Sequence, residues 1–540
     1  MAAYERHDPE KTLLHEVVRE QLEGFLASAS RRDQPVPRFI EQELRAFLRC
    51  GILAHGFLRL RCDDCGHDRL VAFSCKRRGF CPSCGGRRMA DTAAHLVDRV
   101  LPGVPIRQWV LTLPYPLRYR CAYDARLTSG VLRAFIRALF AELRRRARRQ
   151  WGARAEQCGA ATFIQRFGSA LNLNLHFHTL ALDGVYTGGQ GASLRFLPLP
   201  PPDADEMARV LAGTARRIQR VIEAGIEDDE DALARDEPLL ALLSAASLQS
   251  RIATGVHRGE RWRRLGDRVE PQENLVSDTD PEASALVPQH RGMSLHADVA
   301  VPARDRRRLE RLCRYVARPP LAGERLEALP DGRLAVRLKT AWRDGTTHIL
   351  MERRELIERL VPLIPSPRAH QVRYHGILAP GASYRDRVIP VTPRGDSAVC
   401  ASPTRPAAAE QDLASEPGGV SLAPSATPAR PETLPTPNPG RPNATQAPGP
   451  AGDRRRACRM RWADLLQRVF ALDALCCPRC GATMRVVAAI EDPLVARKIL
   501  ACLGLPARAP PVAPASEETL ASDPHDDDWH FDQSPAYDDA

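Results

Sequence analysis

The stretch from Leu171 to Tyr186 reads Leu-Asn-Leu-Asn-Leu-His-Phe-His-Thr-Leu-Ala-Leu-Asp-Gly-Val-Tyr. Polar and apolar residues alternate through its first half, which predicts a β-strand with two unlike faces. Asn172, Asn174, His176 and His178 share one face, and the leucines and a phenylalanine share the other. Imidazoles two residues apart on a strand project side by side, so this pair can bind one divalent cation. Isolated pairs of this kind also occur on ordinary polar sheet faces, and both interpretations stay open here.

Around this strand the chain mixes strand and helix patterns, which predicts an α+β protein. We expect strands at Gln108–Leu113 and Phe163–Phe167, the latter joined to Leu171–Leu182 by a turn at Gly168–Ser169. A hairpin is expected around Asp344–Gly345. Helical spacing of apolar residues predicts helices at 38–48, 127–149, 204–224 and 305–317.

The helix expected at 305–317 carries a tyrosine among arginines. Its apolar stripe consists of Leu309, Leu312, Cys313 and Val316, and Tyr315 lies off that stripe. Three arginines lie on the tyrosine's side of the helix at helical spacing: Arg308, Arg311 and Arg318. A phenol among guanidinium groups suits a phosphate, and these arginines are candidate DNA contacts. Ordinary amphipathic packing is the alternative for a lone tyrosine.

Cysteine pairs indicate a metal site near the N-terminus. Cys62-Asp-Asp-Cys65 and Cys81-Pro-Ser-Cys84 have the spacing of a four-thiolate zinc site, which would be structural because no coordination position stays open. Cys50 and Cys75 are left over as spare thiols, alternative ligands or part of a second site. Arg77 and Arg78 lie beside the cluster, so a DNA-docking role stands against a simple folding role.

A further pair, Cys477 and Cys480, predicts half of a second zinc site near the C-terminus.

Composition limits the class of protein. The chain has 540 residues and a net charge of +11, and residues 391–540 hold more acidic than basic side chains, so the positive charge lies before them. No apolar run is long enough for a membrane span, and the polar N-terminus lacks a secretory signal. Residues 391–456 are Pro-rich and are expected to be a disordered linker, and residues 507–540 an acidic disordered tail.

These motifs together resemble the rolling-circle transposases of the insertion sequence 91 family, within the HUH endonuclease superfamily. Four signatures carry the resemblance: Phe-Ser-Cys-Lys-Arg-Arg-Gly-Phe-Cys-Pro-Ser-Cys at 73–84, the run Gly168–His178, Arg-Tyr-His-Gly at 373–376 with Leu378-Ala-Pro, and Cys-Pro-Arg-Cys-Gly at 477–481 with Met484-Arg. The arginine-rich tyrosine helix ending Arg-Tyr-Val-Ala-Arg-Pro-Pro supports it.

The resemblance implies a nuclease core with a central antiparallel sheet, preceded by a helical and zinc-binding region. It implies that His176 and His178 hold Mg²⁺ or Mn²⁺, and that Tyr315 attacks DNA to give a 5′-phosphotyrosine. For the third metal ligand we favour His296 over Asp298 and Glu310. Position 319 is Pro, so this is a single-tyrosine member, with Tyr374 as a weaker second candidate nucleophile.

The expected organisation is an N-terminal helical segment (1–49), a zinc-binding domain (50–100), a catalytic domain (101–390), the linker, a small C-terminal domain (457–506) and the tail. The expected cofactors are structural Zn²⁺ and catalytic Mg²⁺ or Mn²⁺. The expected partner is single-stranded DNA at element ends and target, in a bacterial cytoplasm. No Walker motif is present, so ATP is not expected. A replication initiator or relaxase, and a non-catalytic zinc-finger DNA-binding protein, remain the alternatives.

Overall fold

The computed structural model describes residues 8–188, 193–224, 232–266, 289–342, 344–390, 463, 468, 473 and 475–515. Helices and antiparallel sheets are mixed along the chain, so the expected α+β class is confirmed. The expected linker (391–456) and most of the expected tail lie outside the described residues, and the domain boundaries stay predictions.

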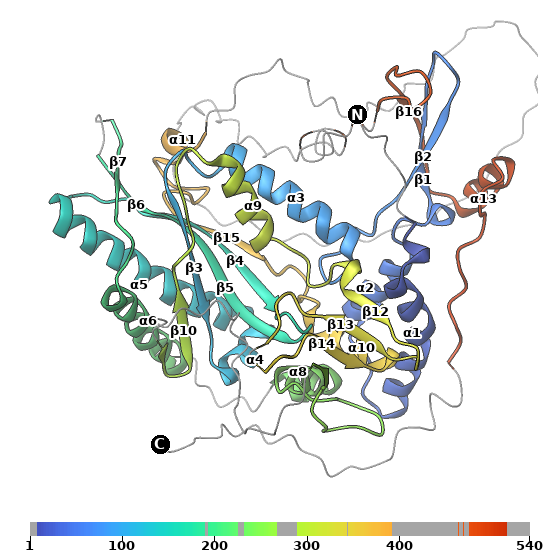
Figure 1. The fold of residues 1–540 in the computed structure, drawn as a ribbon, viewed down its shortest axis with the longest axis horizontal. Coiled ribbons are helices and arrows are strands. Elements are labelled where there is room, and N and C mark those ends of the chain that lie inside the picture. The colour runs from blue at the N-terminus through green and yellow to red at the C-terminus, as the bar shows by residue number, and fades with distance from the viewer. Residues whose placement is uncertain are drawn as a thin grey trace, which may run out of the picture. The chain divides into compact units, whose positions relative to one another are not determined.

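A seven-stranded sheet forms the centre of the fold (Figure 1). Its strand order is β15-β4-β5-β3-β10-β9, and β11 pairs with β3 beside that path. All of these pairs are antiparallel, as expected, and the histidine strand β5 is central. The strands are β3 (Ile106–Thr112), β4 (Gly159–Phe167), β5 (Leu173–Leu182), β9 (Gln289–His290), β10 (Met293–His296), β11 (Ala300–Val301) and β15 (Val372–Gly376).

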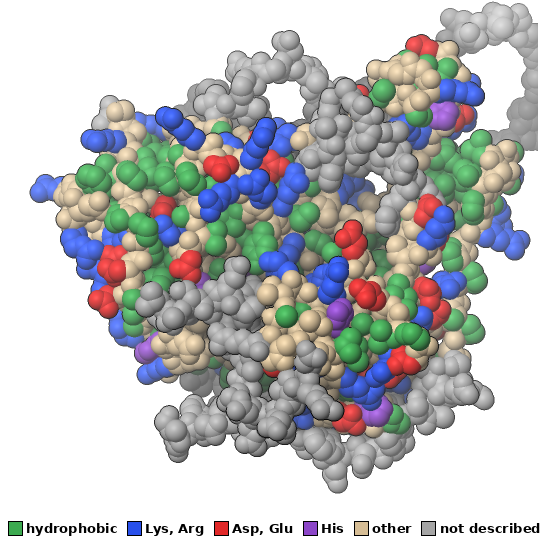
Figure 2. Space-filling view, viewed as in Figure 1, with side chains coloured by type: hydrophobic (Ala, Val, Ile, Leu, Met, Phe, Trp, Pro, Cys, Tyr) green, Lys and Arg blue, Asp and Glu red, His purple; other side chains and the backbone are tan. Residues whose placement is uncertain are grey.

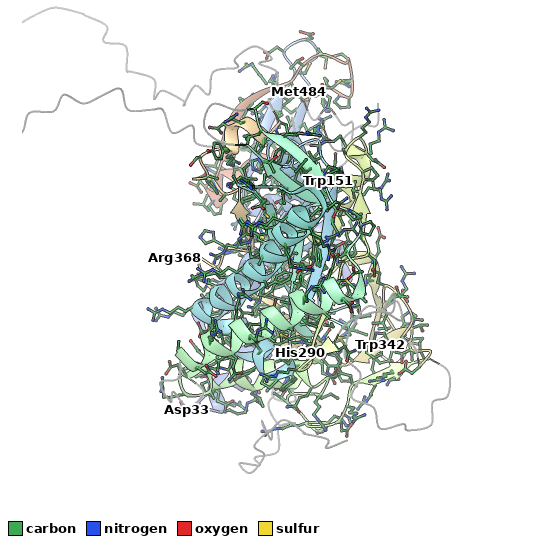
Figure 3. The ribbon with its side chains drawn as sticks, turned by 90° about the vertical axis from the view of Figure 1, so that its left-hand side faces the viewer. Asp33, Trp151, His290, Trp342, Arg368 and Met484 are labelled. Atoms are coloured by element: carbon green, nitrogen blue, oxygen red, sulfur yellow. The ribbon has the colours of Figure 1, made fainter. Side chains whose placement is uncertain are left out.

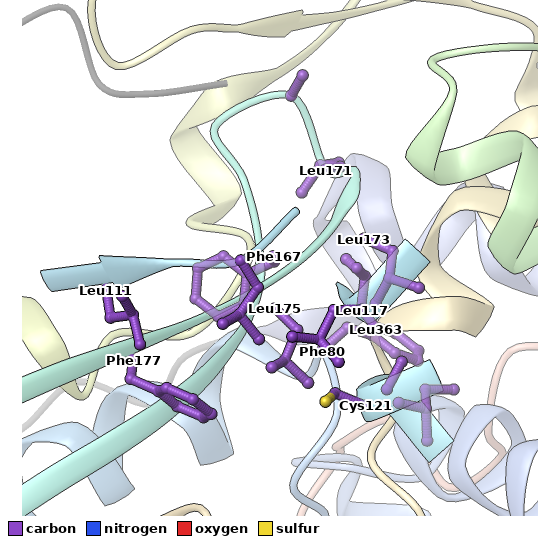
Figure 4. Packing of buried hydrophobic residues seen from close by; sticks show 14 of the residues in the cluster. Phe80, Leu111, Leu117, Cys121, Phe167, Leu171, Leu173, Leu175, Phe177 and Leu363 are labelled. Atoms are coloured by element: carbon purple, nitrogen blue, oxygen red, sulfur yellow. The ribbon is translucent and has the colours of Figure 1, made fainter. Parts of the chain in front are cut away.

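The apolar face of β5 packs into the larger hydrophobic core. Leu173, Leu175 and Phe177 are buried there with side chains of the long helix α5 (Ala125–Trp151). Figure 4 shows these three residues in one buried cluster with Phe167 and with Phe80 from the cysteine-rich region. This packing fixes the direction of the opposite face, because side chains alternate along a strand.

The opposite face is covered by α3 (Pro82–Arg99) and α9 (Arg306–Val316), as Figure 1 shows. Their apolar stripes form a second core with Phe163, Leu180 and Leu182 of the sheet. Asp305 caps α9 by accepting a hydrogen bond from the Arg308 amide at 2.8 Å. The helix that carries Tyr315 is therefore docked directly over the strand that carries the histidines.

A separate three-stranded sheet has the order β16-β1-β2 and joins the two ends of the chain. The hairpin of β1 (Phe57–Arg61) and β2 (Asp68–Ala72) comes from the cysteine-rich region, while β16 (Arg485–Ile490) comes from the C-terminal segment. Met484, labelled in Figure 3, is buried beside these strands. The C-terminal segment thus shares a sheet with the region around Cys62.

Other elements complete the fold. The helices that the sequence placed at 38–48 and 204–224 have those bounds, and the expected hairpin at Asp344–Gly345 is β13 paired with β14. Figure 3 shows Trp151 at the end of α5. The remaining helices and strands are α1 (Leu13–Arg31), α2 (Arg38–Leu48), α4 (Tyr115–Tyr123), β6 (Gly184–Thr187), β7 (Arg195–Pro198), α6 (Ala204–Ala224), α7 (Ala232–Asp236), α8 (Pro238–Leu248), β8 (Arg263–Leu265), β12 (Leu326–Ala328), β13 (Leu334–Arg337), β14 (His348–Met351), α10 (Arg353–Leu360), α11 (Arg385–Val388) and α13 (Pro493–Cys502).

No helix in the described part of the chain combines the length and the apolar character needed to cross a bilayer.

Candidate active site and cysteine clusters

The histidine pair of β5 points its ring nitrogens at one place. The Nε2 atoms of His176 and His178 are 3.0 Å apart. The other ring nitrogen of each histidine has its own partner: His176 Nδ1 lies 2.8 Å from the Asn174 carbonyl oxygen, and His178 Nδ1 lies 2.7 Å from Gln108 Nε2. Such partners orient an imidazole and select its tautomer. Two Nε2 atoms are therefore presented together at the surface of the sheet.

His178 is kept in its neutral form. Its side chain is buried, with a residue exposure of 4%. Burial lowers the pKa of His178 well below its ordinary value, and the charges of His176, Arg318 and Lys339 lower that pKa further. A neutral imidazole keeps a lone pair, which a metal ligand requires.

Tyr315 lies against this pair. The rings of Tyr315 and His178 meet edge to face, with centroids 6.0 Å apart. Arg318 and Lys339 each hold their charge 4.3 Å from the centre of the tyrosine ring. Among the described residues, neither cation forms an ion pair with a carboxylate. The phenol, the two imidazoles and the two positive charges thus lie together where α9 meets the sheet.

Gln165 links the histidine face of the sheet to the helix that carries Tyr315. It lies directly opposite His176 in the pairing of β4 with β5, so its side chain shares the histidine face. Its Nε2 donates a hydrogen bond of 3.0 Å to the Val316 carbonyl oxygen, next to Tyr315 in the chain. Its Oε1 is buried and has no hydrogen-bond partner among the described residues. A buried acceptor without a donor is costly, which indicates a ligand that satisfies it.

His296 does not join the pair. It lies opposite Val110 on β3, and Val110 in turn lies opposite His178, so a whole strand separates the two histidines. Within the described residues, no third His, Cys, Asp or Glu has a ligand atom within 4.8 Å of both imidazole nitrogens. The expectation for His296 is therefore corrected. Neighbouring strands lie about 4.8 Å apart, so His296 is two strand steps from His178, whereas Gln165 is one step from His176.

The remaining arginines occupy different positions. Arg308 and Arg311 are exposed on α9, whereas Arg318 is half-buried beside Tyr315. Arg78 donates a hydrogen bond to the Ala369 carbonyl oxygen, and the Arg77 carbonyl oxygen accepts one from Arg88. Figure 2 shows Lys and Arg side chains over the face where α9 and α3 lie in Figure 1.

Tyr374 lies on β15 and is half-buried. Burial raises the pKa of its phenol, although Arg385 acts in the opposite direction. In the sheet, β4 separates its strand from β5. A phenol held neutral at this distance is poorly placed to use the histidine pair.

The cysteines form two clusters, and neither is the expected set. Cys50 and Cys75 join Cys81 and Cys84, while Cys62 and Cys65 join Cys477 and Cys480. The set Cys62, Cys65, Cys81 and Cys84 is therefore corrected. Cys62 and Cys65 lie at the turn of the β1–β2 hairpin, and a five-residue strand spans about 17 Å. Spacing along the chain does not show in which direction a hairpin points.

The first cluster is built into the main core. Cys50 follows α2, Cys75 follows β2, and Cys81 and Cys84 begin α3. The sulfur atom of Cys84 lies 3.6 Å from that of Cys50 and 3.4 Å from that of Cys75. Four sulfurs around one zinc ion at about 2.3 Å lie roughly 3.8 Å apart, whereas a disulfide requires about 2.05 Å. This cluster has the dimensions of a zinc site.

That cluster also contacts the end of the tyrosine helix. Gly85, directly after Cys84, packs against Pro319, and a Cβ at Gly85 would lie 2.6 Å from the proline Cβ. Since real Cβ atoms do not approach so closely, glycine is required for this contact. The start of α3 therefore supports the chain that follows Tyr315.

Several residues of these sites were missed from the sequence. Gln165 and Lys339 carry no motif, and only strand register and tertiary packing bring them to the histidine pair. Cys50 and Cys75 could be suspected as metal ligands from the sequence, because both were left unassigned beside two clear cysteine pairs.

Two family models match parts of the chain. Residues 159–386 match the model of a putative transposase, and they include β4, β5 and α9. Residues 17–113 match the transposase zinc-binding domain of the insertion sequence 91 type, and they include the first cysteine cluster. No curated protein and no solved structure matches the chain. The two family models occur in one chain in this order, and the chain belongs to the insertion sequence 91 family of transposases.

Proposed function

We propose that this transposase nicks and rejoins single-stranded DNA at the ends of its element, with Tyr315 as the nucleophile and a 5′-phosphotyrosine as the intermediate of rolling-circle transposition. The observation that carries the proposal is the contact between the Tyr315 and His178 rings, flanked by two cations without carboxylate partners. A phosphate would supply a negative charge between these two cations.

The chemical step is a transesterification. The phenolic oxygen of Tyr315 forms a bond to phosphorus as it loses its proton, and the bond from phosphorus to the 3′-oxygen breaks. That oxygen takes up a proton and leaves as a free 3′-hydroxyl. The number of phosphoester bonds is unchanged, so no nucleotide hydrolysis is needed. Attack by a free 3′-hydroxyl on the phosphotyrosine reverses the step and joins DNA.

Arg318 and Lys339 position the scissile phosphate. Both lie on the tyrosine ring, so their charges are next to the place where a pentavalent phosphorus gathers negative charge. They also favour the neutral form of His178. The exposed Arg308 and Arg311 on the same helix would contact phosphates further along the strand.

The residues present fit a divalent cation. Two ligands at right angles, each about 2.1 Å from an ion, lie about 3.0 Å apart, and the two Nε2 atoms have this separation. The unpartnered Oε1 of Gln165 supplies an oxygen ligand on the same face. When bound, Mg²⁺ or Mn²⁺ would polarise a phosphate oxygen. We therefore assign His176, His178 and Gln165 as the ligands.

Gln108 selects the tautomer of His178. For Nε2 to keep a free lone pair, Nδ1 must carry the proton and donate it. The Gln108 amide can accept this bond through its oxygen after a half-turn about its last bond. The Asn174 carbonyl oxygen plays the same part for His176.

The burial of His178 favours a single strand. Because His178 is almost fully covered, the scissile phosphate must approach the histidine pair closely under α9. Duplex DNA is stiff, with a persistence length of about 50 nm, whereas a single strand bends its backbone freely.

The test uses a single-stranded oligonucleotide carrying an element end, labelled at either terminus and incubated with Mn²⁺. The fragment downstream of the nick should become covalently attached to the protein, and the upstream fragment should be released with a 3′-hydroxyl. Tyr315→Phe should reduce adduct formation by at least about 10³-fold.

Tyr374→Phe is the matched control, and it should form the adduct at the wild-type level. Persistence of the adduct in Tyr315→Phe would move the nucleophile elsewhere. Sequence-specific binding without any cleavage would instead support a non-catalytic zinc-dependent DNA-binding protein.

A further inference from the structure

The second cysteine cluster joins residues from opposite ends of the chain. Cys62 and Cys65 lie at the turn between β1 and β2, and Cys477 and Cys480 precede β16. The sulfur atoms of Cys62 and Cys480 are 3.4 Å apart, and those of Cys65 and Cys477 are 3.5 Å apart. These separations are too long for disulfides and close to those around a tetrahedral ion.

The two halves of this cluster have the same local structure. The Gly66 amide donates to the Cys62 carbonyl oxygen, and the Gly481 amide donates to the Cys477 carbonyl oxygen, at 3.0 and 2.9 Å. Both glycines have a positive φ, +70° and +78°. The chain then turns back identically, because the Cys62 amide donates to the His67 carbonyl oxygen and the Cys477 amide to that of Ala482.

Each half therefore has the full backbone geometry of a metal-binding turn but supplies only two thiolates. A tetrahedral thiolate site needs four ligands, and each turn supplies what the other lacks. The sheet holds the turns together, because β16 pairs along β1 from Phe57–Ile490 to Arg61–Arg485.

Two small apolar clusters also join the two segments: one lies under the cysteines, and in the other Leu53 and Phe57 pack with Ala496 and Leu500. The apolar cluster under the cysteines contains few buried side chains: Leu60, Val71 and Met484 with Cys62 and Cys477. The ion pair between Arg485 and Asp63 is exposed, and such pairs contribute little. Each of these clusters is small beside the main core, so a bound metal would add substantially to the stability of the junction.

We propose that one Zn²⁺ bound by Cys62, Cys65, Cys477 and Cys480 fastens the C-terminal segment to the N-terminal zinc region, so that this transposase has two zinc sites and a closed chain. Thiolates in a tetrahedral set favour zinc, and the ion compensates for their mutual repulsion. The entropic cost of bringing the two cysteine pairs together grows only slowly with the length of the chain between them.

The fastened segment reaches the catalytic helix. Arg468 forms ion pairs with Asp98 of α3 at 3.1 Å and with Glu310 of α9 at 2.9 Å. A C-terminal arginine thus lies next to the helix that carries Tyr315.

Metal analysis of the purified full-length chain tests the number of sites. The wild type should contain two zinc ions per chain. Replacing Cys477 and Cys480 by Ser should leave one zinc, and so should replacing Cys62 and Cys65 by Ser. Replacing all four should still leave one, because both pairs belong to one site. Cys476→Ser, next to the cluster but outside it, is the matched control and should keep two.

Hydrogen exchange tests whether the site spans the chain. In the variant lacking Cys62 and Cys65, amides of residues 485–490 should exchange faster, although the substitutions lie more than 400 residues away in sequence. Two zinc ions in either double variant, one zinc ion in the wild type, or unchanged exchange at 485–490 would each overturn the proposal.

The proposal is also testable after cutting the chain. A specific protease site placed within residues 391–456 allows cleavage of the folded protein. The C-terminal piece should stay with the rest during gel filtration in zinc, and it should separate after chelation. Separation in the presence of zinc would contradict the proposal.

Discussion

His178 and Cys84 are both buried candidate metal ligands, with exposures of 4% and 6%, yet different contacts hold them in place. His178 has a hydrogen-bond partner in Gln108, a ring contact with Tyr315 and a strand neighbour on each side. The Cys84 sulfur faces the sulfur atoms of Cys50 and Cys75. Four clustered thiols gain little from one another without an ion.

The two kinds of site differ in the role expected of the metal ion. The histidine site is shaped by packing and hydrogen bonds of the protein, so an ion there adds chemistry to an existing geometry. The cysteine clusters are shaped by the ion, so removing it should cost structure. Substitutions at the two kinds of site should therefore separate loss of activity from loss of stability.

The largest effect is expected at the first cysteine cluster. Cys84→Ser should destabilise the protein by about 4 kcal/mol or more, because its metal joins α2, β2 and α3 within the main core. Thermal unfolding and zinc content would measure this. Cys121→Ala, a buried cysteine in the same core but outside the cluster, should cost only about 1 kcal/mol. Equal stability of the two variants would refute the contrast.

The opposite pattern is expected at the histidine pair. His176→Ala should lower the rate of cleavage by about 10²-fold or more, because the ion loses a ligand. The same variant should change the free energy of unfolding by less than about 1 kcal/mol, since this side chain is only half-buried. Oligonucleotide cleavage and chemical denaturation check the two parts. A variant that unfolds but still cleaves would reverse the assignment.

A third histidine, His375, tests how burial keeps an imidazole neutral outside the histidine pair. Burial, and then Arg373, lower the pKa of His375 to about 4. In the unfolded chain the pKa of His375 is near 6.5. Between about pH 4 and pH 6.5 the unfolded chain therefore binds a proton at His375 that the folded chain does not bind. Stability should therefore fall as the pH drops from about 6.5 to 4, by roughly 2–3 kcal/mol from this group.

Denaturation curves at several pH values would show this loss. His375→Gln should flatten the pH dependence by that amount, while cleavage at neutral pH should remain close to wild type. An unchanged slope in the variant would show that other groups cause the loss.

The smallest effect separates two residues near the catalytic face. Gln165→Leu should weaken the affinity for Mn²⁺ by about tenfold, because an oxygen ligand is removed. Gln165→Glu should restore it. His296→Ala should change this affinity by less than about threefold, because a strand lies between His296 and His178. Calorimetric titration of Mn²⁺ measures all three, and equal losses at both positions would restore His296 as a ligand.

Local sequence pattern determined much of the fold. The alternation in Leu171–His178 predicted the strand and its two faces, and helical spacing predicted the amphipathic helix with Tyr315 off its apolar stripe. These features depend on neighbours a few residues apart, where the backbone period sets which side chains share a face. The same signatures identified the family, which the family models support.

Only the tertiary structure decided which distant residues meet. Strand register placed Gln165 beside His176 and His296 a strand away, and packing brought Lys339 to Tyr315. The direction of the β1–β2 hairpin separated Cys62 from Cys81 and brought it to Cys480. The sequence of a cysteine pair does not show which other pair shares its metal. That depends on the path of the chain in space and not on the number of residues between the pairs.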